Sequence, residues 1–143
     1  MATSMANLNI QSTVKLNNDV RMPILGLGVY QSPSGRVTGN AVNFALRIGY
    51  RHVDTARIYG NEADVGEAVR ESGVPREDLF VTKKLWNSDQ GYDSTLRACE
   101  ASLKRLGLDY LDLYLVHFPV PNVRKESWRA MEILLKKGRC RAI

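Results

Sequence analysis

The chain has little of what membrane, secreted and metal-binding proteins depend on. No apolar run in its 143 residues is long enough to span a bilayer, and the first nine residues lack the apolar core of a signal sequence. It has only two cysteines, Cys99 and Cys140, at a spacing that fits neither a metal site nor a redox motif. We therefore expect two free thiols in a cytoplasmic protein that binds no metal.

Neither sign of charge dominates strongly. The sequence has 20 Lys and Arg against 15 Asp and Glu, a formal net charge of +5. Much of the excess lies over residues 124–141, where basic side chains are interleaved with Trp128, Met131 and Leu134 at helical spacing. This pattern favours the solvated face of an amphipathic helix over a nucleic-acid site. We expect neither a nucleic-acid nor a membrane partner.

Hydrophobic periodicity predicts a hairpin followed by repeated strand and helix units. Residues 1–12 are expected to form a flexible tail, and alternation over 13–22 predicts a short β-hairpin. The predicted strands are 24–28, 52–54, 79–86, 111–116 and the beginning of a fifth at 139–143, with helices near 37–48, 61–72, 94–106 and 126–137. A repeat of about 30 residues fits βαβ units and a parallel sheet, either doubly wound or closed into a barrel.

The helices and the fourth strand also carry predictions about burial. The strand over 111–116 is an almost continuous apolar run, as expected for a buried parallel strand, and glycines at 49, 73, 107 and 138 are expected to end the helices. The residues that repeat at helical period are Val37, Ala41, Phe44, Ala45 and Ile48 in the first helix, Val65, Ala68 and Val69 in the second, and Leu96, Cys99, Leu103 and Leu106 in the third.

The string GYRHVDTARIYGNEADVG, residues 49–66, resembles the signature of the aldo-keto reductases at nearly every position. The resemblance runs from about Thr13 to Ile143, and it extends to members like prostaglandin F synthase and aldose reductase. It implies an α/β fold that is the first half of a (β/α)8 barrel, with an N-terminal β-hairpin and an end at the start of the fifth strand. Residues 13–143 would then be a partial oxidoreductase domain, since a complete barrel has about 250 residues.

The same resemblance nominates four catalytic residues. Asp54 and Tyr59 lie in the signature, Thr82-Lys83-Lys84-Leu85-Trp86 matches the segment in which a lysine precedes Leu-Trp and so selects Lys84, and Leu115-Val116-His117-Phe118-Pro119 nominates His117. Three successive predicted strands thus each deliver a titratable residue at the carboxyl end, where a β/α barrel keeps its active site.

Lys83 departs from the family, which usually has a small hydroxyl residue at that position. Alternation along a strand places Lys83 on the side opposite Lys84. We therefore expect the departure to affect local packing more than catalysis.

The chemistry implied is reduction of an aldehyde or ketone, with hydride from NADPH and a proton from Tyr59. A free phenol has a pKa of about 10, so a neighbouring cation, Lys84, would ease proton donation. Asp54 would keep that ammonium charged in a water-poor site, and His117 would hydrogen-bond and orient the substrate oxygen.

Further residues are expected around this group by the same resemblance. Gly28, Val29 and Asp54 would lie beside the nicotinamide ribose, and glycine permits close approach of the backbone to a ligand. Tyr30, Trp86 and Phe118 would be apolar walls of a substrate pocket that also contains His117, although most members have tryptophan in place of Phe118. The parts of the family fold that bind the carboxamide and the adenosine 2′-phosphate have no counterpart in these residues.

Each of these residues, considered alone, could have a purely structural role. A carboxylate at a strand end is often a helix cap, an Asp-Lys pair is often structural, and a histidine after an apolar strand is often packed in a core. Two function classes therefore stay open. The chain is either part of an NADPH-dependent reductase of small carbonyl compounds, or a non-catalytic half barrel that associates with a partner or with itself through open sheet edges.

Overall fold

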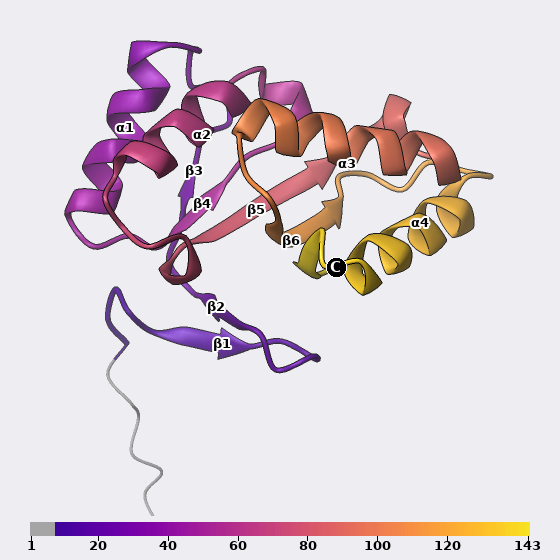
Figure 1. The fold of residues 1–143 in the computed structure, drawn as a ribbon, viewed down its shortest axis with the longest axis horizontal. Helices are drawn as coiled ribbons and strands as arrows, with labels where there is room; N and C mark the ends of the chain where they lie inside the picture. The colour runs from indigo at the N-terminus through magenta and orange to yellow at the C-terminus, as the bar shows by residue number, and fades with distance from the viewer. Residues whose placement is uncertain (1–7) are drawn as a thin grey trace, which may run out of the picture.

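A computed structural model describes residues 8–143 and shows an α/β fold built on a parallel sheet (Figure 1). The antiparallel hairpin consists of β1 (Thr13–Lys15) and β2 (Arg21–Pro23). The five-stranded sheet follows in the order β3 (Leu27–Gly28), β4 (His52–Asp54), β5 (Phe80–Leu85), β6 (Leu111–Val116) and β7 (Cys140–Ala142), with every neighbouring pair parallel. The predicted hairpin and parallel sheet are confirmed.

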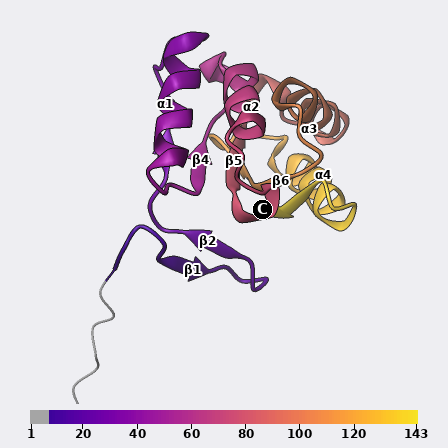
Figure 2. The same cartoon turned by 60° about the vertical axis from the view of Figure 1, so that its left-hand side comes forward.

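One helix follows each of the first four strands of the sheet, and all four helices cover the same face (Figures 1 and 2). They are α1 (Arg36–Arg47), α2 (Glu62–Glu71), α3 (Tyr92–Leu106) and α4 (Arg124–Lys136), and each packs beside the next in sequence. The 3₁₀ turns are η1 (Arg57–Tyr59), η2 (Arg76–Asp78) and η3 (Asn87–Asp89). Helices on one face of a parallel sheet are the arrangement of a barrel. The fold is thus the first half of a (β/α)8 barrel.

The two faces of the sheet differ in burial toward the carboxyl ends of the strands. On β5, Val81, Lys83 and Leu85 are buried under the helices; on the opposite face Phe80 and Thr82 are buried and Lys84 is half-buried. The strand over 111–116, predicted to be buried, is buried at Leu111, Asp112 and Tyr114 and half-buried at Leu113, Leu115 and Val116.

Burial of the helices follows the prediction in α2 and α3, departs from it in α1, and follows it in α4 except at Trp128. In α2 and α3, the residues of the predicted faces are buried, with Leu96 half-buried, and α3 ends at Gly107 in the left-handed conformation as predicted. In α1 the buried residues are Thr38, Val42, Ala45 and Leu46, whereas Val37, Ala41, Phe44 and Ile48 are exposed. This sequence carries two apolar stripes, and helical period alone did not identify the one that packs on the sheet. Trp128 of α4 is likewise exposed.

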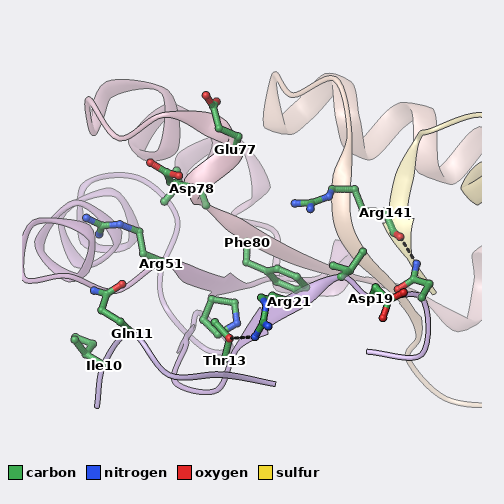
Figure 3. A pocket seen from close by; sticks show the side chains of 14 residues that line it. Ile10, Gln11, Thr13, Asp19, Arg21, Arg51, Glu77, Asp78, Phe80 and Arg141 are labelled. Atoms are coloured by element: carbon green, nitrogen blue, oxygen red, sulfur yellow. Dashed lines mark hydrogen bonds between the residues drawn. The ribbon is translucent and has the colours of Figure 1, made fainter. Parts of the chain in front are cut away.

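The hairpin lies below the amino ends of the strands and is fastened there by side chains (Figure 3). Asn18 Nδ2 donates to the Arg141 carbonyl oxygen at 2.7 Å, and the His52 ring lies 3.0 Å from the Pro23 carbonyl oxygen and 2.8 Å from Thr82 Oγ1. Ile24 N–H donates to the Ser12 carbonyl oxygen and so belongs with the hairpin and not with the sheet. The first strand of the sheet, predicted over residues 24–28, is therefore shorter and begins at Leu27. A polar cavity of about 520 Å³ separates the hairpin from the sheet.

Residues 1–7 of the expected N-terminal tail lie outside the described residues, and residues 8–12 contain a turn in which Ser12 N–H donates to the Asn9 carbonyl at 3.0 Å.

Cys99 and Cys140 are free thiols, and burial raises the pKa of each to about 12. Over the described range, no helix has the length and apolar character needed to cross a membrane.

A buried ionic cluster joins β5 to α2 and α3. Lys83 is 1% exposed and Glu62 is 3% exposed, and Lys83 Nζ lies 3.4 Å from Glu62 Oε1. Arg105 Nε donates to the other carboxylate oxygen, Glu62 Oε2, at 2.6 Å. Burial lowers the pKa of Lys83 from its ordinary 10.5 to about 8, although the Glu62 carboxylate opposes the shift. A charge so placed costs stability even when it is paired.

The close packing of α2 on the end of α3 generates a prediction at Gly66. A β-carbon at this position would overlap the backbone carbonyl of Leu106. Gly66→Ala is therefore expected to lower the free energy of unfolding by about 3 kcal/mol. Gly39→Ala on α1 is the matched control, because its β-carbon meets no atom within 4 Å and alanine favours helix, so a gain of about 1 kcal/mol is expected. Urea unfolding measures both; equal effects would contradict the packing.

The buried lysine generates a prediction about pH. Since the folded-state pKa of Lys83 is about 8 against an ordinary 10.5, the unfolded chain binds more protons between these values. Stability contributed by this group therefore rises with pH across that window. Relative to Lys83→Met, the free energy of unfolding of the wild type is expected to rise by about 2 kcal/mol between about pH 7 and pH 9.5.

Urea unfolding of both proteins at the two pH values gives this difference directly. Lys104→Met, the same change on the exposed face of α3, serves as the control and is expected to show no such dependence. A difference in free energy of unfolding between the wild type and Lys83→Met that stays constant with pH would rule out the low pKa of Lys83.

Candidate active site

The carboxyl ends of three neighbouring strands meet at one edge of the sheet. Asp54 ends β4 and pairs with Thr82 in register, Lys84 lies two residues further along β5, and His117 follows β6, where its N–H donates to the Leu85 carbonyl at 3.0 Å. Tyr59 ends η1, the 3₁₀ turn that follows β4. Parallel pairing therefore brings together the four side chains predicted from separate motifs.

Lys84 is the centre of this group. Its ammonium donates hydrogen bonds to Asp54 Oδ1 and to Tyr59 Oη, the latter at 3.2 Å. The side chain is 16% exposed and that of Asp54 is 33% exposed, so the ion pair lies at the rim of the protein interior, neither in bulk water nor sealed from it. Because Tyr59 Oη accepts a hydrogen bond from a cation, its own proton remains available to another acceptor.

His117 stands on the other side of Tyr59. The two rings are 6.0 Å apart and nearly perpendicular. The pKa of His117 is lowered below its ordinary 6.5, first by burial and second by the nearby Lys84 ammonium. The imidazole is therefore neutral at pH 7 and can donate one N–H. Its Nδ1 is buried and has no hydrogen-bond partner among residues 8–143.

Aromatic rings surround the polar group. Tyr30 packs on Tyr59 with ring centroids 5.1 Å apart, and Trp86 meets the His117 ring edge-on at 5.2 Å. Phe118 is stacked on the imidazole at 4.9 Å with an interplanar angle of 11°. Tyr30 and Phe118 are both exposed. The predicted wall residues thus flank the predicted catalytic residues.

Gly28 and Val29 lie beside Asp54, but in different ways. A β-carbon built on Gly28 would have only Asp54 Oδ2 within 4 Å, at an ordinary 3.9 Å, so internal packing does not require glycine there. The Val29 side chain is buried in the core, facing away from this edge. Any contact of Val29 with a ligand is therefore restricted to its main chain.

Two residues that the sequence analysis did not single out fix the loops of this edge. Asn61 is fully buried, and its Nδ2 donates to the carbonyls of Val29 at 3.0 Å and Ser32 at 3.1 Å, which fastens the loop carrying Tyr30. Gln90 Nε2 donates to the Phe118 carbonyl at 2.6 Å, which fastens the loop after β6. Asn61 lies within the signature string, whereas nothing in the sequence marks Gln90.

The arrangement can donate a proton and stabilise an oxyanion. Tyr59 has a hydroxyl proton beside a cation, and His117 has an N–H on the adjacent side, so an oxygen placed between them would accept from both. Amino-acid side chains carry no transferable hydride, so any reduction at this edge needs a cofactor. Gly28 has no side chain, and a β-carbon there would meet only Asp54 Oδ2, so a flat ring or sugar could approach its backbone closely.

Comparison with known proteins places these features in a family. The model of the aldo/keto reductase family matches residues 25–143. Glyoxal reductase of Bacillus subtilis is 53% identical over 135 residues, which cover 94% of this chain and 49% of the relative.

Two solved structures resemble the fold. The aldo/keto reductase of Brucella melitensis superposes with a TM-score of 0.88 at 53% identity, over 92% of this chain and 50% of that one. The Bombyx mori aldo-keto reductase, solved in complex with NADP, superposes with a TM-score of 0.83 at 38% identity, over 91% of this chain and 48% of that one. The chain therefore spans about half the length of these relatives, and it belongs to the aldo-keto reductase family.

Proposed function

We propose that the protein reduces aldehydes or ketones to alcohols with NADPH, and that Tyr59 donates the proton. The observation that supports this most strongly is the Lys84 ammonium, which hydrogen-bonds Asp54 and Tyr59 Oη at once. A cation at that place stabilises the negative charge that remains on the tyrosine oxygen when its proton leaves. Asp54 offsets the cost of keeping the ammonium charged there.

His117 orients the substrate oxygen in this proposal. A neutral imidazole donates one hydrogen bond without competing with Tyr59 as an acid, and burial first, then the Lys84 charge, lowers the pKa of His117. The carbonyl oxygen would accept from Tyr59 and His117 together. Such donors act on charge that develops during the reaction, and one of them is typically worth a few kcal/mol, or about 100-fold in rate.

The cofactor is proposed to lie along Gly28, the Val29 main chain and Asp54, and when bound it supplies the hydride. NADPH is preferred to other reductants because the Bombyx mori relative was solved with NADP. Tyr30, Trp86 and Phe118 would line the substrate pocket and favour small carbonyl compounds with an apolar or aromatic body. We further propose a cytoplasmic location, where NADPH is available as a reductant.

A second candidate function is association with another chain instead of catalysis. Trp128, Val116 and Pro119 line a mainly apolar cleft of about 590 Å³ beside α4, and the inner face of β6 is half-buried. In the 143-residue chain on its own, these apolar surfaces favour self-association. Defined oligomers on gel filtration without cofactor binding would favour this candidate.

Tyr59→Phe tests the reductase. Loss of NADPH absorbance at 340 nm is followed with an aromatic aldehyde, both for the 143-residue chain and for a chimera in which the second half of Bacillus subtilis glyoxal reductase follows residue 143. We expect little or no turnover by the chain alone. The chimera should turn over and lose at least about 100-fold in kcat in Tyr59→Phe, because proton donation is removed.

The control is Tyr92→Phe, the same change at an exposed site on α3, which should leave kcat unchanged. Full activity in Tyr59→Phe, or absence of carbonyl reduction by a folded chimera that binds NADPH, would contradict the proposed function.

A further inference from the structure

The buried cluster on the outer face of the sheet lies directly behind the candidate active site. Lys83 and Lys84 are neighbours on β5 but point to opposite faces, so the Lys83–Glu62 pair and the Lys84–Tyr59 pair lie on opposite sides of the same layer. The side chains of the outer pair lie on the face of the sheet opposite to Tyr59 and Lys84. Their effect on the reaction would therefore act through the backbone segments that they connect.

One member of the outer pair contacts a residue of the inner pair, and the other lies close to Tyr59 in sequence. Lys83 Nζ donates a hydrogen bond to the carbonyl oxygen of Lys84 at 3.0 Å, which holds the peptide that carries the inner ammonium. Glu62 is the first residue of α2 and lies three residues after Tyr59. The pair thus connects the strand that carries the cation to the start of the helix that follows the phenol.

The two oxygens of the Glu62 carboxylate have different partners, one on α3 and one on β5. Glu62 Oε2 is held by Arg105 of α3, which also donates to Ser102 Oγ at 3.0 Å. Glu62 Oε1 is buried and has no aligned hydrogen bond within the described chain, so the Lys83 ammonium at 3.4 Å is the positive charge that compensates it. Removing that charge leaves Glu62 Oε1 uncompensated, and such buried groups shift or recruit new partners.

The inner pair is sensitive to small movements. Tyr59 Oη and Lys84 Nζ are 3.2 Å apart, near the outer limit of a good N–H···O bond, so a displacement of less than 1 Å would break it. A misplacement of about 1 Å in catalytic geometry can cost up to about 100-fold in rate. A charged buried lysine also lowers the stability of the fold, so stability alone does not account for Lys83 at this position.

We propose that Lys83 is a positioning residue, which acts through Glu62 and the Lys84 peptide to set the separation of Tyr59 Oη and Lys84 Nζ. The inference rests on the proposed function, in which Tyr59 is the acid and Lys84 its cation. Lys83 does not touch substrate or cofactor. Its side chain links β5 to the start of α2 directly.

Kinetics of the chimera in which the second half of Bacillus subtilis glyoxal reductase follows residue 143 test the proposal. In Lys83→Met, kcat is expected to fall about tenfold, while KM and the Kd of NADPH change less than about twofold. The deuterium isotope effect on kcat from NADPH labelled at the transferred position should increase, because chemistry becomes more rate-limiting. Lys104→Met should change none of these. A lowered Tm with unchanged kcat would reduce Lys83 to a structural role and overturn the proposal.

A double-mutant cycle with Glu62→Gln separates this link from general loosening. If Lys83 acts through Glu62, the double variant loses no more kcat than the more impaired single variant. Additive losses would overturn the proposal. Lys83→Thr, which has the residue type usual in the family, replaces Lys83→Met if the methionine variant does not fold.

Crystal structures keep the proposal testable without turnover. In Lys83→Met or Lys83→Thr, the Tyr59 Oη to Lys84 Nζ distance is expected to exceed about 3.5 Å, and an unchanged hydrogen bond would overturn the inference. Absence of carbonyl reduction by the folded, NADPH-binding wild-type chimera would instead refute the proposed function, and the crystallographic distance would still decide whether Lys83 positions the pair.

Discussion

The hydrogen bonds of the Lys84 ammonium to Asp54 and Tyr59 are the interaction on which the arrangement of this edge depends. They join residues of β4, β5 and η1, and they can form only if β4 and β5 run parallel and end at the same edge. An ammonium at a half-buried position needs a carboxylate to stay charged, and a phenol next to it gains a stabilised conjugate base. The requirement for one cation with two partners therefore constrains strand direction, register and the conformation of the loop after β4.

Much of this could be predicted from sequence, because the determinants are local. Strand direction followed from the repeat length, and strand ends followed from apolar runs that stop at a polar residue. Alternation along β5 correctly separated Lys83 from Lys84, since the side-chain period of a strand is two. The end of α3 at Gly107 followed from the need for a left-handed residue at that position.

The features that sequence did not predict depend on which segments meet in three dimensions. Helix α1 has apolar residues on two faces, and only its contact with the sheet and α2 selects Val42 and Leu46 over Phe44 and Ile48. Asn61 and Gln90 act on carbonyls that are distant in sequence, so no spacing rule marks them. Local motifs marked the candidate catalytic residues, whereas the roles of the residues that fasten the loops were visible only in the fold.

The two neighbouring lysines of β5 lie on opposite faces of the sheet, and their surroundings differ. Lys84 is half-buried and paired with Asp54, and Lys83 faces a closed layer where burial lowers its pKa to about 8. If packing alone governed position 83, a small residue would be less costly than a buried ammonium. The expectation that Lys83 affects packing more than catalysis therefore stays a prediction, and the hydrogen bond from Lys83 Nζ to the carbonyl oxygen of Lys84 is the contact on which the opposite inference rests.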